Sequence, residues 1–273
     1  MTTPARSDVW SSPLHQGTRS RTGAQVDRQF LQDLLGVLGD CRFLWVPNLT
    51  DTTTSVDGSR YAATVTWSET LAAFDTPPAR LGAGAMVDFN GTDEEGDTPD
   101  ADRLSFGDGA ADQAFSSVMV VKPGAPTAST QSLVAKSDSL SAQEWELDVQ
   151  TGTGYLRVGL IDESASARIE RLAGASVGTA WTMVGHTYDG SGSAAGLHVH
   201  QDGARSDVTT DGAGTYVAME NTASALHVAS RFTTKAQFFD GGVALLAVTA
   251  KELSEDDLWV VKELVNGYFG LSL

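Results

Sequence analysis

Three acidic side chains at alternate positions are the residues of this chain best spaced to do chemistry. Glu144, Glu146 and Asp148 alternate with apolar residues, and alternate side chains of a strand lie on one face. A retaining glycosidase needs two carboxyls about 5–5.5 Å apart, one as nucleophile and one as acid and base. A solvated strand face displays the same pattern. We expect the solvated face and no enzyme, and keep the three acids only as weak catalytic candidates.

An acid-rich segment is the best candidate for a metal site. Nine acids and a single arginine lie between Asp88 and Asp112. Calcium takes six to eight oxygen ligands, which irregular loops rich in Asp and Asn supply. Asp88, Asn90 and Asp93 are the candidate ligands, although their spacing does not fit an EF-hand. A solvated acidic loop is the alternative, so we expect either no cofactor or a structural calcium ion.

Aromatic and histidine side chains offer two further binding chemistries. Trp145 and Tyr155 could stack on sugar rings if they are exposed. His198 and His200 share one strand face and could bind zinc or nickel, but no third ligand is evident. His186 and His227 stand alone in strands, where packing is the expected role. The sequence has no G-x-S-x-G, Walker A or Rossmann glycine pattern.

Composition excludes several classes of protein. The chain has 273 residues, 41% of them hydrophobic, and a formal net charge of -17. Such an acidic chain repels a phosphate backbone, so we expect no nucleic-acid partner. The lone Cys41 excludes an internal disulfide framework. No segment reaches the ~20 apolar residues of a membrane span, so we expect no membrane insertion. Residues 1–28 carry no apolar run, so we expect no signal peptide.

The elements that must position these residues are mostly strands. Apolar residues at three- and four-residue spacing predict a helix over 26–39, and Ser254 followed by three acids predicts a second helix ending at Asn266-Gly267. Between them, the alternation of period two and the turn residues predict an all-β sandwich. The expected strands are 41–45, 61–67, 84–90, 103–107, 115–122, 131–136, 144–150, 154–161, 166–172, 180–188, 196–201, 214–219, 225–229 and 241–249.

A succession of landmarks resembles laminin-G-like, concanavalin A-type jelly-roll domains. Residues 115–123 (FSSVMVVKP) look like the opening strand of that family, and residues 180–191 (AWTMVGHTYDGS) look like its tryptophan strand and turn. Residues 197–203 (LHVHQDG) are similar to its "l-Y-v-D-G" hairpin. Residues 238–243 followed by 253–258 look like the closing strand and short helix, and residues 87–93 resemble the start of the domain.

This resemblance implies a two-sheet antiparallel jelly-roll sandwich with an N-terminal arm, a short N-terminal helix and a short C-terminal helix. The expected divisions are an arm over 1–25, an anchoring region of a helix plus strands over 26–80, and the laminin-G-like domain over 81–273. Relatives often hold calcium near the closing strand, which adds Asp240 to the candidate ligands, although Ala244 and Leu245 stand where relatives often carry an acid. The three alternating acids also look superficially like the "E-x-D-x-E" strand of jelly-roll β-glucanases, with Glu146 and Asp148 departing from that pattern.

A looser resemblance links the whole chain to structural proteins of tailed phages. It implies a non-enzymatic virion protein, made in the host cytoplasm, that decorates a capsid or belongs to a tail. Its partners would be the major capsid protein, a tail protein or further copies of itself in a homo-oligomer. The expected docking residues lie in the arm and first helix: Arg6, Trp10, Arg19, Arg21, Phe30, Leu34 and Leu38. The alternative is a module that binds host-surface or matrix glycans, and a jelly-roll glycoside hydrolase is third.

Overall fold

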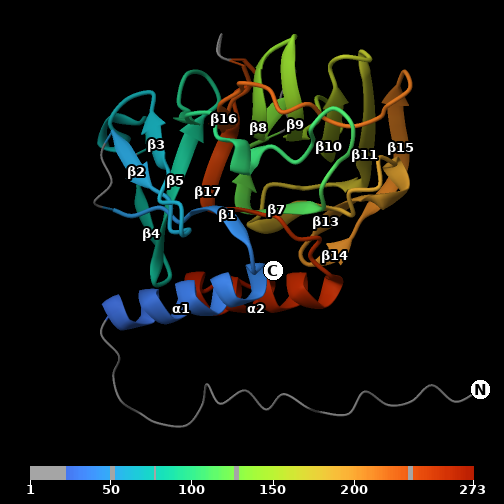
Figure 1. The fold of residues 1–273 in the computed structure, drawn as a ribbon. Helices are drawn as coiled ribbons and strands as arrows, with labels where there is room; N and C mark the ends of the chain where they lie inside the picture. The colour runs from blue at the N-terminus through green and yellow to red at the C-terminus, as the bar shows by residue number, and fades with distance from the viewer. Residues whose placement is uncertain (1–22, 50–52, 77, 126–128, 233–235) are drawn as a thin grey trace, which may run out of the picture.

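Two antiparallel sheets and a pair of helices form three layers in the computed structural model (Figure 1). The structure describes residues 23–49, 53–76, 78–125, 129–232 and 236–273. Every strand pairing in these ranges is antiparallel, and the two sheets enclose a large apolar core. The expected all-β jelly-roll sandwich with two flanking helices is therefore confirmed.

Sheet A has eight strands and lies between the helices and the other sheet. Seven of them follow one another across the sheet, and β1 (Cys41–Trp45) pairs separately with the central strand β17. The seven are, in spatial order, β14 (Ala204–Arg205), β13 (Leu197–Gln201), β12 (Thr182–Tyr188), β7 (Phe115–Pro123), β17 (Asp240–Thr249), β5 (Gly84–Asn90) and β4 (Ala79–Leu81).

Sheet B has nine strands, and its outer face is the one turned away from the helices (Figure 1). Its spatial order is β15 (Asp207–Ala213), β11 (Ala167–Ser176), β10 (Tyr155–Asp162), β9 (Ala142–Val149), β8 (Gln131–Ser139), β16 (Leu226–Val228), β6 (Gly96–Thr98), β3 (Thr64–Trp67) and β2 (Thr54–Val56). Short 3-10 turns at η2 (Leu71–Ala73), η3 (Asp102–Leu104) and η4 (Ala194–Gly196) complete the regular structure.

The two helices, α1 (Gly23–Leu38) and α2 (Glu255–Phe269), cover the outer face of sheet A. Ser254 caps α2 as expected: its hydroxyl accepts a hydrogen bond from Asp257 N at 3.1 Å, and the Asp257 carboxylate accepts one from Ser254 N at 3.0 Å. The helix runs past the expected end at Asn266-Gly267, because Gly270 supplies the left-handed residue that ends it. No helix in the described ranges is long and apolar enough to cross a membrane.

Sheet A is apolar on both faces because it is the middle layer. Along β7, Met119 and Val121 face the core between the sheets, while Val118 and Val120 face the helices. This double burial accounts for the unbroken apolar run that marks the strand in the sequence.

Residues 26–80 do not form a unit separate from the sandwich. β1 pairs with β17 in sheet A, whereas β3 pairs with β6 in sheet B. The expected boundary at residues 80 and 81 falls inside β4, which forms a hairpin with β5. The arm expected over residues 1–25 lies almost wholly outside the described residues.

Some expected strands differ from those observed. Residues 103–107 form a 3-10 turn and an isolated bridge at Gly107, and residues 214–219 are not a strand. The strand of that region is β15, which precedes them. All seven of its residues are exposed or half-buried, so it carries none of the apolar alternation that marks a half-buried strand.

Candidate functional site

The outer face of sheet B gathers charged side chains that are buried rather than solvated. On β9, Trp145 and Leu147 belong to the core between the sheets, so Glu146 and Asp148 lie on the opposite face. Both acids are nonetheless almost fully buried. The expected solvated strand face is therefore wrong: the acids are covered by partners from neighbouring strands and loops.

Glu144 does not share the face of the other two acids. The register between β8 and β9 shifts here: Lys136 stands opposite Trp145 and Ser137 opposite Gln143, which leaves Glu144 as the extra residue of a bulge. Its carboxylate lies 3.0 Å from Lys136 Nζ and accepts hydrogen bonds from Ser105 and Thr222. The alternating acids thus divide into a separate Glu144 and a Glu146–Asp148 pair.

Arg157 on β10 holds the Glu146–Asp148 pair together. Its Nη2 atom lies 3.1 Å from Glu146 Oε1 and 2.5 Å from Asp148 Oδ2, while its Nη1 atom lies 3.0 Å from Glu170 Oε1. Arg231 reaches the other oxygen of Glu146 at 2.6 Å. Burial raises the pKa of Glu170, and the Arg157 charge opposes that rise. Both Glu146 oxygens are engaged by guanidinium groups, which is unsuitable for a nucleophile or a proton donor.

A cavity of about 230 Å³ lies beside this charge network. Strands β9, β10, β11 and β15 and the connections around them supply its walls: Leu140, Gln143, Glu146, Ile161, Glu163, Ser166, Ala167, Arg168, Ala213 and Arg231. Among the residues that the structure describes, four buried atoms of the lining make no hydrogen bond: Gln143 Nε2, Glu146 Oε2, Glu163 Oε1 and Arg231 Nε. Of these, Glu146 Oε2 is paired only by the charge of Arg231. The cavity therefore offers donors and an acceptor that a polar ligand could satisfy.

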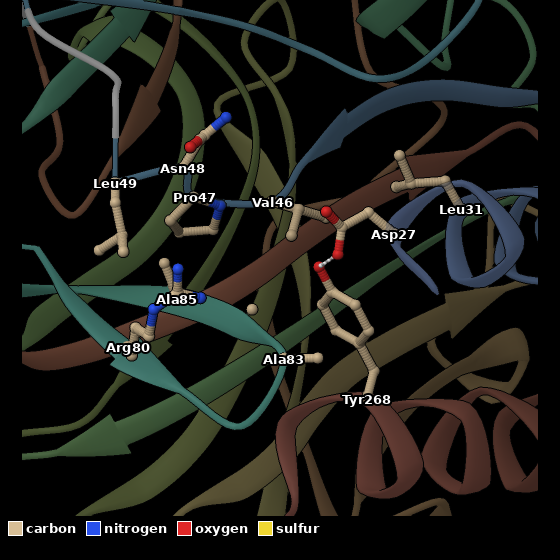
Figure 2. A pocket seen from close by; sticks show the side chains of 11 residues that line it. Asp27, Leu31, Val46, Pro47, Asn48, Leu49, Arg80, Ala83, Ala85 and Tyr268 are labelled. Atoms are coloured by element: carbon tan, nitrogen blue, oxygen red, sulfur yellow. Dashed lines mark hydrogen bonds between the residues drawn. The ribbon is translucent and has the colours of Figure 1, made fainter. Parts of the chain in front are cut away.

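A second hollow, of about 300 Å³, lies on the helix side of the molecule (Figure 2). Asp27 and Leu31 of α1, Tyr268 of α2 and the β4–β5 turn border it. Tyr268 donates a hydrogen bond to Asp27 at 2.8 Å, and its burial raises the pKa of the phenol. Because this donor and acceptor already satisfy each other, the hollow has less to offer a polar ligand.

The helix residues expected to dock on a partner are covered by the protein itself. Phe30, Leu34 and Leu38 are buried between the helices and sheet A. Phe30 stacks on Tyr268 of α2 with a centroid distance of 4.0 Å. The expectation that this stripe meets a partner is wrong, because the same spacing that suits a docking face also suits an internal one. The arm candidates Arg6, Trp10, Arg19 and Arg21 lie outside the described residues.

The calcium candidates come together in part. Asp240 stands opposite Asn90 in the β17–β5 ladder. The pKa of Asp88 is raised, mainly by burial and to a lesser extent by the charge of Asp240. Asn90 directs its amide nitrogen at carboxylates: it donates to Asp93 at 2.9 Å and to Asp75 at 3.1 Å. These contacts hold the segment without an ion, and calcium binding stays a prediction.

The two aromatic candidates differ in position. Trp145 is fully buried between the sheets and donates a hydrogen bond to Leu104 O, so it has no face to offer a sugar. Its expected role in glycan stacking is therefore wrong. Tyr155 is half-buried at the start of β10, on the same face as Arg157, since a single residue lies between them.

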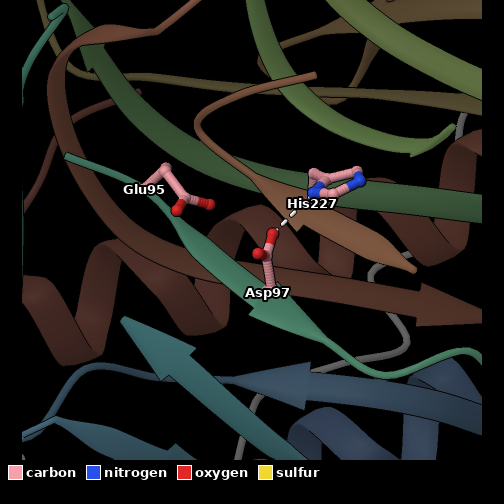
Figure 3. Close-up of side chains that lie close together, drawn as sticks. All are labelled: Glu95, Asp97 and His227. Atoms are coloured by element: carbon pink, nitrogen blue, oxygen red, sulfur yellow. Dashed lines mark hydrogen bonds and ion pairs between the residues drawn. The ribbon is translucent and has the colours of Figure 1, made fainter. Parts of the chain in front are cut away.

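The histidines lie in different surroundings. His186 is fully buried, with Nδ1 2.8 Å from the Ser117 hydroxyl, and burial lowers its pKa to about 3. Burial also lowers the pKa of His200 to about 4. His227, expected to pack alone, instead lies beside Asp97 and Glu95 (Figure 3). Sequence reasoning missed this group because its two strands are 130 residues apart in the chain.

Comparison with known proteins identifies the fold but no family. No family model matches the chain, and no curated protein matches it. Among solved structures, the chain is similar to the binding domain of paraclostridial mosquitocidal protein 1, with a TM-score of 0.57 at 10% identity, covering 83% of this chain and 52% of that one.

Botulinum neurotoxin receptor-binding domains are similar as well. A type C structure, described as dependent on two ganglioside molecules for cell entry, gives a TM-score of 0.59 at 13% identity and covers 84% of this chain and 52% of that one. A type D domain in complex with N-acetylneuraminic acid gives a TM-score of 0.52 at 12% identity, covering 85% of this chain and 52% of that one. The chain spans about half the length of these domains. The likeness shows a jelly-roll, lectin-like fold. It does not support a relationship to laminin-G domains or to phage proteins.

Proposed function

We propose that the protein is a non-catalytic carbohydrate-binding module that takes one sugar unit in the cavity on the outer face of sheet B. The observation that carries the proposal is the set of unpartnered buried atoms on Gln143, Glu163 and Arg231 in the lining. A glycan-binding module was the alternative expected from the sequence, and it is preferred here to a virion structural protein.

The lining has the chemistry that a sugar ring requires. Amide, carboxylate and guanidinium groups are planar and present fixed donors and acceptors, which suit neighbouring hydroxyls of a pyranose. Ile161 and Leu140 add apolar surface for the C–H side of the ring. The volume is below the ~300 Å³ at which pockets for larger ligands begin, so it favours a single terminal unit over a long chain.

The similar solved structures support this class of ligand. One of them is a ligand-binding domain in complex with N-acetylneuraminic acid, and another is described by its interaction with gangliosides. Because this chain spans about half of those domains, the position of the sugar here is argued from its own cavity and not carried over from them.

Hydrolysis is disfavoured by the same network. Glu146 lines the cavity, but Arg157 and Arg231 hold both of its oxygens. A nucleophile or general acid needs a carboxylate oxygen that can reach the substrate, and each oxygen of Glu146 is already paired with a guanidinium group.

Filling the cavity without removing a hydrogen bond tests the proposal. Glycan arrays followed by calorimetric titration of the best sugar give the wild-type affinity. Ala213 lies at the exposed end of the lining, so Ala213→Trp should block the cavity and weaken binding at least tenfold. Thr209→Trp, four residues earlier on β15 and outside the lining, is the matched control and should bind as the wild type does.

Two results would reject the proposal. The first is an array on which the wild type binds no glycan. The second is equal weakening by Ala213→Trp and Thr209→Trp, which would place the sugar elsewhere. Activity of the wild type on chromogenic β-glucans would favour the hydrolase instead.

A role in a phage virion stays a prediction of the sequence. Its arm candidates, Arg6, Trp10, Arg19 and Arg21, are the residues that a capsid or tail partner would contact. Removing residues 1–25 should abolish incorporation into particles while the sandwich still folds, and truncated protein on purified particles would contradict the anchoring role.

A further inference from the structure

Two short strands of sheet B bring one histidine and two carboxylates together. His227 of β16 stands directly opposite Asp97 of β6, and Glu95 precedes Asp97 by two residues. Alternate residues share a face, so all three side chains are on the outer face of the sheet. Figure 3 shows the Glu95 and Asp97 carboxylates turned toward the same ring edge of His227. We propose that these three side chains bind a divalent transition-metal ion of the zinc type.

The donor atoms are close enough to share an ion. One ligand atom from each of the three residues lies within 4.8 Å of the other two. Donors bound to one tetrahedral zinc ion at ~2.1 Å are ~3.4 Å apart, so the most distant donors must approach each other by ~1.4 Å, a movement that two side chains can share. An imidazole nitrogen with two carboxylates suits zinc and its neighbours among the transition metals, whereas calcium prefers a larger shell made of oxygen alone.

A fourth residue orients the imidazole for this task. His227 Nε2 lies 2.8 Å from Asp138 Oδ1, and the same oxygen accepts a hydrogen bond from Ala225 N at 3.1 Å. An Nε2–H that donates to Asp138 leaves Nδ1 as the atom that faces Asp97, at 2.5 Å. Ligating histidines usually donate their second nitrogen to a carboxylate in this way. Asp138 is thus a positioning residue, and Nδ1 is the nitrogen left to bind the metal.

Burial divides the three ligands into two fixed and one adjustable. Glu95 and His227 are almost fully buried, and the Ser230 hydroxyl lies 3.4 Å from Glu95 Oε2. The Asp97 side chain is 35% exposed. Asp97 can therefore rotate to admit the ion from solvent and then close on it, with water completing the coordination. This site shares no residue with the sugar cavity, so the two proposals are tested independently.

Spectroscopy of the metal-free wild-type protein is the first test. Addition of Co²⁺ should give visible absorption that saturates at one equivalent, and one equivalent of Zn²⁺ should remove it. In NMR spectra, Zn²⁺ should shift the Nδ1 resonance of His227 far more than its Nε2 resonance. Absence of saturable binding, or a saturable signal with the His227 resonances unmoved, would overturn the proposal.

Variants then assign the ligands by calorimetric titration with Zn²⁺. Asp97→Asn and Glu95→Gln should each weaken binding at least tenfold. Asp138→Asn should weaken it 10–100-fold while the Co²⁺ spectrum at saturation keeps its wild-type shape, as a positioning role requires. Glu69→Gln, an exposed acid outside both candidate ligand sets, is the matched control for Glu95→Gln and should bind Zn²⁺ as the wild type does. Equal affinities for Glu95→Gln, Glu69→Gln and the wild type would refute the assignment.

Discussion

The outer faces of the two sheets differ in how they are covered. The outer face of sheet A is apolar and lies under α1 and α2. Leu34 of α1 is buried in the same cluster as Val120 and Leu245 of the sheet. The outer face of sheet B has no helix over it among the described residues, and instead carries Glu146, Asp148 and their arginine partners. The buried side chains on the two faces are therefore covered by different chemistry.

This difference accounts for the side on which the two proposed sites lie. Apolar burial stabilises without specific partners, so the side chains packed under the helices offer few polar groups to a ligand. Buried charges must be paired and hydrogen-bonded, and the loops that complete such pairing leave hollows with polar walls. Both the sugar cavity and the proposed metal site lie on the sheet B side.

Removing the charge of Arg157 in sheet B should have the largest effect on the free energy of unfolding. Arg157→Met leaves Glu146, Asp148 and Glu170 close together without their shared partner, and breaking a buried pair in this way costs about 3–5 kcal/mol. Urea unfolding at neutral pH measures the change. The half-exposed Arg205, paired with Asp207, is the control: Arg205→Met should cost at most ~1 kcal/mol. Equal losses would mean that the buried network is no stronger than a surface ion pair.

Truncation under the helices should come next. Leu34→Ala empties part of the apolar layer between α1 and sheet A and should lower the free energy of unfolding by about 3 kcal/mol. Trp259→Ala on the outer side of α2, where the indole is 58% exposed, should change it by less than about 0.5 kcal/mol. A small loss for Leu34→Ala would show that the helices cover sheet A loosely.

The pH dependence of stability should separate the two sheets. His186 of sheet A has its pKa lowered to about 3 by burial, so its contribution is full above pH 6.5 and is lost as the pH falls toward 3. Glu170 of sheet B has a raised pKa, so its contribution is gained as the pH falls. Between pH 6.5 and 5, the free energy of unfolding of the wild type should fall by about 2 kcal/mol because of His186. His186→Gln should remove this part of the fall. Parallel pH profiles for variant and wild type would contradict this assignment.

The smallest effect is expected at the acidic turn after β5. Because Asn90 already contacts Asp93 and Asp75, adding calcium to the metal-free protein should change the free energy of unfolding by less than about 0.5 kcal/mol. Thermal melts with and without the ion measure it. A clear rise that Asp88→Asn abolishes would instead establish the calcium site expected from the resemblance.

The sequence predicted local structure better than it predicted which distant residues come into contact in the fold. The apolar run along β7 and the acids after Ser254 follow from local rules, and both elements were confirmed. The bulge at Glu144 was not visible, because a one-residue shift depends on the partner strand and reverses which face a side chain occupies. The group of Asp97 and His227 was missed for a similar reason, since only the β6–β16 pairing joins them.

The position of the described chain ends has a practical consequence. Residue Gly23 begins α1, and Leu273 folds back on α2, where its backbone nitrogen lies 3.1 Å from Asn266 Oδ1 (Figure 1). Both described ends therefore lie on the helical side. A tag, a fused protein or a sensor chip that holds the molecule through Leu273 leaves the opposite sheet facing the solution. Immobilisation through Leu273 is thus the orientation of choice for measuring weak, multivalent contacts on sheet B.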